Sequence, residues 1–157
     1  MLKKIVKLST ALMFLLGLTA CGGGGADGGG GSGGSHHAGL NCLSSSCHDG
    51  TSAAPLFFVG GTAYTSGGGV QTNATITLRN AVTSSVVATL TTDASGNFYS
   101  TSTISAFVSG MSGFEDGADV TGTGPAGSVI MPGTVSSGTA GCNQSTCHDS
   151  SNRIIIN

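Results

Sequence analysis

The middle of the chain carries short runs of alternating polar and apolar residues, separated by residues that favour turns. The clearest run is ATITL at residues 74–78, whose period of two is the signature of a strand with one buried face. No stretch of this middle keeps the 3.6-residue period of a helix. We therefore predict an all-β fold, a small antiparallel β-sandwich flanked by loop-rich segments. The expected strands cover residues 56–64, 74–78, 85–91 and the residues from Phe98 onward, with turns at 66–69, 80–81 and 93–97.

The two ends of the chain have other patterns. A basic start and a short apolar stretch in residues 1–20 are typical of an export signal, since the stretch is too short to span a membrane. Residues 21–35 are nearly all glycine, which predicts a flexible tether. The expected parts are the signal (1–20), the tether (21–35), an N-terminal Cys/His segment (36–54), the β-sandwich (55–135) and a C-terminal Cys/His segment (136–157).

The signal ends in Leu18-Thr19-Ala20-Cys21, which resembles the lipobox of bacterial lipoproteins. The resemblance implies that Cys21 takes the lipid and becomes the new N-terminus. Gly22 follows it in place of the aspartate that usually keeps lipoproteins in the inner membrane. We expect an outer-membrane or cell-surface lipoprotein, or an extracellular protein, that touches membrane only through its lipid. The alternative is an ordinary export signal cleaved just before a cysteine.

The number and sign of the charged residues limit the kinds of molecule that the protein is expected to bind. Beyond residue 20 the fixed cations are Arg79 and Arg153, against seven Asp and Glu, so the formal charge there is −5. Nucleic-acid binding requires a basic face, so we exclude it. Charged residues make up 8% of the chain, where about a quarter is usual. Weak self-repulsion favours self-association or contact with another surface, and a secreted β-domain with a Ser/Thr coat is the alternative.

A second resemblance concerns the middle. The turn Thr92-Asp93-Ala94-Ser95-Gly96-Asn97-Phe98 has the Thr-Asp-x-x-Gly-x-Phe form of carboxypeptidase-regulatory-like (transthyretin-like) domains, and residues 57–108 resemble them. The resemblance implies a β-sandwich that serves as a scaffold or binding module. No strand is assigned after Phe107. Residues 122–127 fit G-x-G-x-x-G, but no helix is expected to follow, so we do not predict a dinucleotide site.

The candidate chemistry lies in two near-copies, NCLSSSCHDG at residues 41–50 and GCNQSTCHDS at residues 141–150. Covalent haem attachment takes two nearby thiols, which add to the vinyl groups, and an imidazole directly after the second thiol to bind the iron. The usual spacing leaves two residues between the thiols, whereas four stand here. The residues concerned are Cys42, Cys47 and His48 in the first motif and Cys142, Cys147 and His148 in the second.

Both motifs resemble the wide-loop Cys-x4-Cys-His sites of bacterial multihaem c-type cytochromes. The resemblance implies two covalently bound haem c groups, with His48 and His148 as proximal ligands of the iron. The remaining histidines, His36 and His37, are adjacent, and neighbouring side chains of an extended segment point to opposite sides. We therefore expect one of them as the sixth ligand of each iron.

Six-coordinate iron transfers electrons and does not activate oxygen, so no enzymatic activity is expected. Met111 and Met131 are the competing sixth ligands, and the other role open to them is apolar packing.

Two other uses of the same residues stay open. Exported proteins favour disulfides, and each motif's cysteine pair would close a loop. Two Cys2His2 zinc sites can also be assembled, although adjacent Cys and His rarely aim at one tetrahedral ion.

We expect a dihaem cytochrome that carries electrons at or beyond the outer cell surface, to redox partner proteins or an extracellular acceptor. Its two haem sites lie together in one molecule or at opposite ends. The second geometry resembles extracellular cytochrome filaments, with the His36/His37 arm reaching the next subunit. The alternative is a surface lipoprotein binding module or adhesin with two disulfide-closed loops.

Overall fold

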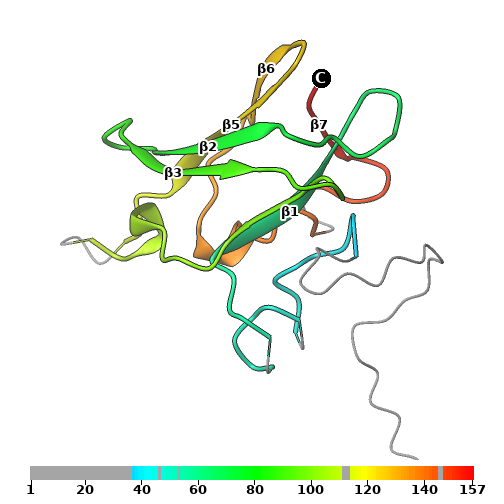
Figure 1. The fold of residues 1–157 in the computed structure, drawn as a ribbon. Helices are drawn as coiled ribbons and strands as arrows, with labels where there is room; N and C mark the ends of the chain where they lie inside the picture. Colours follow the sequence, from blue (N-terminus) through cyan, green and yellow to red (C-terminus); the bar gives the residue numbers. More distant parts are fainter. Residues whose placement is uncertain (1–36, 46, 53, 111–113, 145–146) are drawn as a thin grey trace, which may run out of the picture.

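The computed structural model describes residues 37–157 apart from 46, 53, 111–113, 145 and 146. The described chain forms two β-sheets and two short 3-10 turns, η1 (Ser105–Phe107) and η2 (Ser137–Thr139) (Figure 1). The export signal, the glycine tether, Cys21 and His36 lie outside the described residues. Within the described part, no helix has the length and apolar character needed to cross a membrane.

The prediction of an all-β fold is confirmed. The first sheet has the order β4-β1-β7 and the second the order β3-β2-β5-β6. The strands are β1 (Val59–Tyr64), β2 (Thr75–Asn80), β3 (Val86–Thr91), β4 (Asn97–Ser100), β5 (Ala118–Gly124), β6 (Gly127–Ile130) and β7 (Ile154–Ile155). Every named pair is antiparallel except β1 with β7, which is parallel and so departs from the purely antiparallel sandwich expected.

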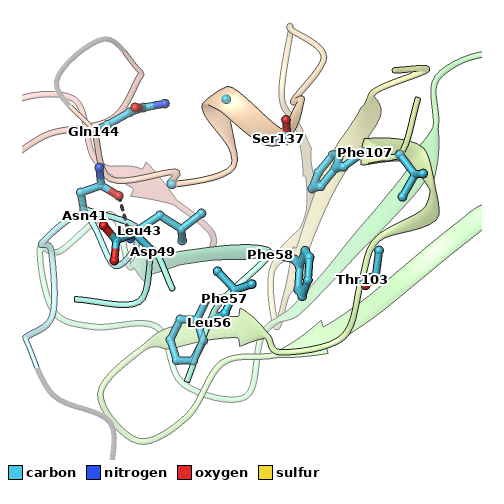
Figure 2. A pocket seen from close by; sticks show the side chains of 13 residues that line it. Asn41, Leu43, Asp49, Leu56, Phe57, Phe58, Thr103, Phe107, Ser137 and Gln144 are labelled. Carbon is cyan, nitrogen blue, oxygen red and sulfur yellow. Dashed lines mark hydrogen bonds between the residues drawn. The ribbon is translucent and has the colours of Figure 1, made fainter. Parts of the chain in front are cut away.

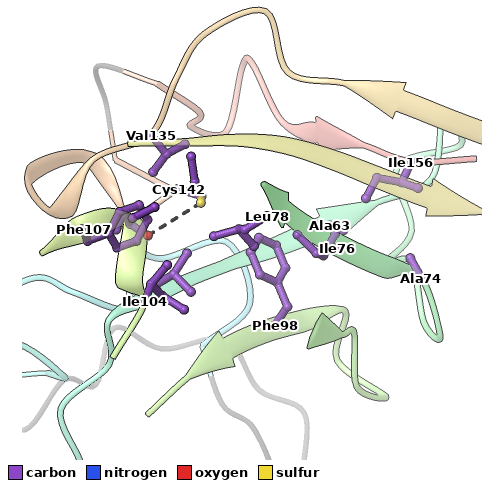
Figure 3. Close-up of a cluster of buried hydrophobic side chains, with 14 residues drawn as sticks. Ala63, Ala74, Ile76, Leu78, Phe98, Ile104, Phe107, Val135, Cys142 and Ile156 are labelled. Carbon is purple, nitrogen blue, oxygen red and sulfur yellow. Dashed lines mark hydrogen bonds between the residues drawn. The ribbon is translucent and has the colours of Figure 1, made fainter. Parts of the chain in front are cut away.

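The hydrophobic core lies between the two sheets (Figure 3). The alternation in β2 buries Ile76 and Leu78, which are 1% and 0% exposed, against Phe98 of the other sheet. Burying side chains of this size contributes about 1.5–3 kcal/mol each. All six residues of β1 are buried, so this strand is covered on both of its faces. One face packs in the core, and the N-terminal Cys/His segment covers the other.

The predicted turn at residues 93–97 is present and links the two sheets. The Asp93 carboxylate accepts hydrogen bonds from the backbone N–H groups of Ser95 (2.8 Å) and Asn97 (3.0 Å). Gly96 has a φ of +73°, in the left-handed region, and a Cβ there would lie 2.7 Å from the Ala63 carbonyl oxygen. The turn therefore requires both the aspartate and the glycine.

The β-sandwich was expected to extend to residue 135, but no individual strand was assigned after Phe107. β5 and β6 form a hairpin, and the G-x-G-x-x-G segment covers the end of β5, the turn and the start of β6 rather than a dinucleotide loop. The signal for β5 is weak because Gly122 and Gly124 interrupt it, and glycine has a low propensity for strands. Those glycines admit Ile156, since a Cβ on Gly122 would overlap its side chain.

Candidate functional site

The second Cys/His motif is a loop that leaves and rejoins the edge of the first sheet. Before the loop, Gly60 of β1 donates to the Ala140 carbonyl (3.0 Å) and accepts from the Cys142 N–H (2.9 Å). After the loop, β7 pairs with the same edge further along, and Ile156 donates to the Tyr64 carbonyl (2.8 Å). The segments before and after the loop run in the same direction as β1, which explains why the pairing of β7 with β1 is parallel. Residues 143–153 are held at both ends by β1.

The first motif lies on the opposite face of the same strand. A Cβ on Gly60 would lie 3.2 Å from the Cys42 Cβ, and one on Gly61 would lie 2.8 Å from the Cys142 Cβ. Consecutive residues of a strand face opposite ways. The first cysteine of each motif therefore packs against β1 from its own side, at neighbouring positions. Glycine at both positions permits this close approach of the backbone.

The two motifs also contact each other directly. A Cβ on Gly141 would overlap the side-chain oxygen of Asn41 and lie 3.3 Å from the Leu43 Cβ. Figure 2 shows Asn41 and Asp49 of the first motif near Gln144 of the second, around a cavity of about 380 Å³. We call this cavity the first groove. Segments a hundred positions apart in the chain thus meet at one end of the molecule.

The described parts of the two motifs share backbone hydrogen bonds at corresponding positions. In the first, Ser44 donates to the Asn41 carbonyl (3.1 Å) and Cys47 to the Ser44 carbonyl (3.0 Å). In the second, Gln144 donates to Gly141 (3.2 Å) and Cys147 to Gln144 (2.9 Å). Each copy therefore has two consecutive backbone hydrogen bonds at corresponding positions, and the second of them ends at the second cysteine of the motif.

Each motif's histidine is oriented by a backbone carbonyl. His48 Nδ1 lies 2.7 Å from the Pro55 carbonyl oxygen, and His148 Nδ1 lies 3.0 Å from that of Asn152. A carbonyl oxygen can only accept, so Nδ1 carries the proton in both rings. In the neutral form the lone pair is then on Nε2, which is the form that binds a metal ion.

The aspartate after each histidine accepts the hydrogen bonds of a turn, and in the second copy that turn includes Asn152, whose carbonyl accepts from His148. Asp149 accepts from the Ser151 N–H (2.8 Å), the Ser151 hydroxyl (2.7 Å) and the Asn152 N–H (2.9 Å). Asp49 accepts from the N–H (2.9 Å) and hydroxyl (2.7 Å) of Thr51. The bonds from Ser151, chiefly that of its hydroxyl, lower the pKa of Asp149 below its ordinary value.

The next residue of each copy closes the turn. Ser52 donates to the Cys47 carbonyl, and Asn152 Nδ2 donates to that of Cys147 (3.0 Å). The repeat therefore extends to Asp-x-Ser/Thr-Ser/Asn, which the sequence analysis missed. Aligning the two copies past their Cys-His-Asp would have revealed the shared hydroxyl residue two positions after the aspartate.

The His48 ring has a second support. It stacks on Phe57 with the ring centroids 3.7 Å apart and an interplanar angle of 3°. Phe57 stacks in turn on Tyr99 at 4.3 Å and 8°. Phe57 also lines the first groove (Figure 2). This column of three rings fixes the plane of the His48 imidazole in addition to its hydrogen bond.

The cysteines differ in burial. Cys142 is 7% exposed and packs in the hydrophobic core (Figure 3), and its burial raises the pKa of the thiol to about 12. Burial also raises the pKa of Cys42. Cys42 and Cys142 are free thiols, so neither motif is closed by a disulfide between its own two cysteines. Within the described ranges, no cluster of three or more Cys, His, Asp or Glu forms a ready metal site.

A second, apolar cavity opens beside the second motif, and we call it the second groove. Its volume is about 250 Å³. Cys142 and His148 line it, together with Met131 and Arg153. The remaining wall is mostly isoleucine and valine from β5, β6 and β7. The thioether that the sequence analysis ranked behind the histidines therefore shares a cavity with His148.

His37 departs from the extended conformation expected of the His36-His37 pair. Its φ is +58°, in the left-handed region, and its carbonyl accepts from the Leu40 N–H (3.2 Å) in a turn. Two residues later the chain is tied to β1, where Gly39 donates to the Thr62 hydroxyl (2.8 Å). The extended backbone expected at His37 is therefore wrong, and His36 lies outside the described residues, so the relative direction of the two side chains stays a prediction.

Comparison with known proteins adds no further evidence on this site. No protein-family model matches the chain, and neither a curated protein nor a solved structure does. The family resemblances therefore rest on the motifs quoted above.

Proposed function

We propose that the protein is a dihaem c-type cytochrome that carries electrons at or beyond the outer cell surface. The observation that carries the proposal is the repeated geometry of the two Cys-x4-Cys-His motifs. In both, Nδ1 of the histidine donates to a backbone carbonyl, and the aspartate after the histidine accepts the hydrogen bonds of the turn that follows. Disulfide loops alone would not require the same imidazole orientation twice, whereas a metal ligand does.

The residues present fit covalently bound haem. Each motif would attach one haem through two thioether bonds, at Cys42 and Cys47 or at Cys142 and Cys147. His48 and His148 would bind the iron through Nε2. Bound haem supplies a one-electron redox couple, and the chain's own part is to hold the ring, orient the imidazole and exclude water. His36 and His37 are the proposed sixth ligands, which leaves no open position for catalysis.

Contact between the motifs supports transfer inside one molecule. Cys42 and Cys142 pack at neighbouring positions on opposite faces of β1, and Asn41 touches Gly141. Two haems attached there would lie side by side rather than at opposite ends. An electron accepted at one is then passed to the other before it leaves for a redox partner or an extracellular acceptor.

The location and assembly of the protein belong to the same proposal. Residues 1–21 support export and a lipid anchor at Cys21, with the glycine tether holding the domain away from the membrane. Self-association through the His36/His37 arm would extend the haem pair into a longer chain. The tie from Gly39 to Thr62 limits that arm, because each residue spans at most about 3.6 Å. A neighbouring subunit must therefore approach this face closely.

The deciding experiment is the intact mass and absorption spectrum of the mature protein, from an export host with haem-attachment machinery. We expect a mass raised by two haems and sharp low-spin bands after dithionite. The matched control, Cys42→Ser with Cys47→Ser, should keep one haem at the second motif. A colourless protein, whose mass is lowered only by the hydrogens of disulfides, would instead identify a surface binding module.

A further inference from the structure

The second groove combines a reactive motif with an apolar wall. Cys142 and His148 line it at one side, and Val129, Ile130 and Ile155 line it at another. These three apolar side chains are 48%, 71% and 37% exposed. Exposed apolar residues gathered around a cavity mark a surface that another group covers. The group that the neighbouring motif would attach is flat, large and mostly apolar.

A single fixed cation also lines this groove. Arg153 is one of two arginines in the chain, and no lysine occurs after Lys7. Its guanidinium lies over the Tyr64 ring, 4.7 Å from the centroid, and donates through Nη1 to the Gly68 carbonyl (3.3 Å). A guanidinium has five N–H donors, and this hydrogen bond to a described residue uses one of them. Tyr64 and Gly68 therefore hold the cation in place at the groove.

The other arginine has no such position. Arg79 is exposed on β2 and donates through Nη1 to the Ser84 carbonyl (3.2 Å). The second groove is lined by Arg153 and not by Arg79. The two residues have the same charge and the same kind of backbone bond, so they form a matched pair for an experiment.

We propose that the second groove is the seat of the haem attached at Cys142 and Cys147, and that Arg153 binds its propionate groups. This inference rests on the proposed function. The propionates are the anionic edge of an otherwise apolar ring, and guanidinium binds carboxylate through two parallel hydrogen bonds. The isoleucine and valine wall takes the apolar part of the ring and keeps water from it.

The assignment makes the two haems unequal. The first motif has the His48–Phe57–Tyr99 column of rings, and the second has a cation. A positive charge beside a haem disfavours the oxidised state, which carries one more positive charge. Arg153 therefore raises the reduction potential of the second haem, and its removal lowers that potential.

The test compares Arg153→Gln with Arg79→Gln in the dihaem protein, by a spectroelectrochemical titration of each. Both variants lose one positive charge. We expect Arg153→Gln to lower one of the two midpoint potentials, and Arg79→Gln to shift neither by a comparable amount. Arg153→Lys keeps the charge and should keep the potential closer to that of the parent protein. Haem content is measured first, from the absorbance per mole of protein.

The outcomes separate this inference from the proposed function. If the parent protein carries no haem, the proposed function fails and this assignment fails with it. If both haems are attached and Arg153→Gln shifts the potentials no more than Arg79→Gln, only the seat and the propionate contact are wrong. If Arg153→Gln fails to fold, the Arg153→Lys variant decides. Lysine cannot bind a carboxylate through two parallel hydrogen bonds, so this variant should alter the pH dependence of one midpoint potential. An unaltered pH dependence would overturn the assignment.

Discussion

At the scale of single residues, each of the two histidines uses its Nδ1 in a hydrogen bond to the protein backbone. His48 and His148 each donate Nδ1–H to a backbone carbonyl a few residues further along the chain. The cysteines are held less evenly, because Cys142 is a core residue while Cys147 is partly exposed. Haem addition needs an accessible thiol, so under the proposed function the segment that carries Cys142 would pair with β1 only after the thioether bond had formed.

Thiol labelling of the haem-free protein should show this difference. Burial removes water from the thiolate of Cys142 and raises its pKa to about 12, so at neutral pH the reactive form is scarce. We expect Cys142 to alkylate on the order of a thousandfold more slowly than a free cysteine, whose pKa is about 8.5. Cys147 is the internal comparison and should label first. Peptide mass spectrometry with and without urea measures both, and equal labelling in the folded chain would contradict the burial of Cys142.

At the scale of elements, β1 is the support of the whole site. Its Gly60 and Gly61 admit the two motifs from opposite faces, and its edge pairs with both ends of the second motif. Since every residue of this strand is buried, a change there has no room to relax.

Gly61→Ala should destabilise the fold. The new Cβ would lie 2.8 Å from the Cys142 Cβ and 2.9 Å from the Phe98 ring. Overpacking of this kind costs about 1–3 kcal/mol. Gly138→Ala is the control, because no atom lies within 4 Å of a Cβ built there. Urea unfolding of both variants measures the free energy of unfolding, and equal midpoints would mean that the second motif does not pack on β1.

The stability contributed by the contact between η2 and the segment before β5 should depend on pH. The Ser137 hydroxyl and its N–H donate to Glu115, and these bonds lower the pKa of that carboxyl. Since the folded pKa is depressed, the contribution to stability is complete above the ordinary glutamate pKa of about 4.3 and is lost as pH falls through the folded value. Ser137→Ala should raise the Glu115 pKa toward its ordinary value in a carboxyl NMR titration. Ser128→Ala, which removes a hydroxyl on β6, should leave that pKa unchanged.

At the scale of the whole molecule, the sheets bring two distant motifs to one end of the fold. This arrangement suits a haem pair in each molecule, with the arm that carries His36 and His37 leaving from the same region. Gly39 is tied to β1, so deleting residues 22–41 would damage the domain as well as remove the arm. Point substitutions are therefore the better test of the arm.

Replacing His36 and His37 together by alanine should convert at least one haem to the high-spin form. If the histidines bind the iron of a neighbouring molecule, light scattering should also show smaller particles. Met131→Leu is the comparison, because Met131 shares the second groove with His148. Unchanged low-spin spectra in the double variant, with a high-spin signal in Met131→Leu, would reassign the sixth ligand of the second haem to the thioether.

The local sequence pattern was sufficient to predict some of the strands, one turn and the candidate motifs. The alternation in residues 74–78 and the Asp93–Gly96 turn predicted structure that is present, because both depend on residues close in sequence. The same holds for the Cys-x4-Cys-His spacing, which defines the candidate chemistry without any contact beyond the motif. β5 was missed because its glycines weaken the local signal, and its stability comes from pairing with β2 and packing on Ile156.

Only the tertiary structure decided how the two motifs relate. The contacts of Gly60 and Gly61 with Cys42 and Cys142 join segments far apart in the chain, and a local pattern contains no information on such contacts. The same is true of the parallel β1–β7 pair. The burial of Cys142 and the position of Arg153 in the second groove also depend on which surfaces the folded sheets bring together. The sequence alone determined the two candidate sites, and folding around β1 made them neighbours.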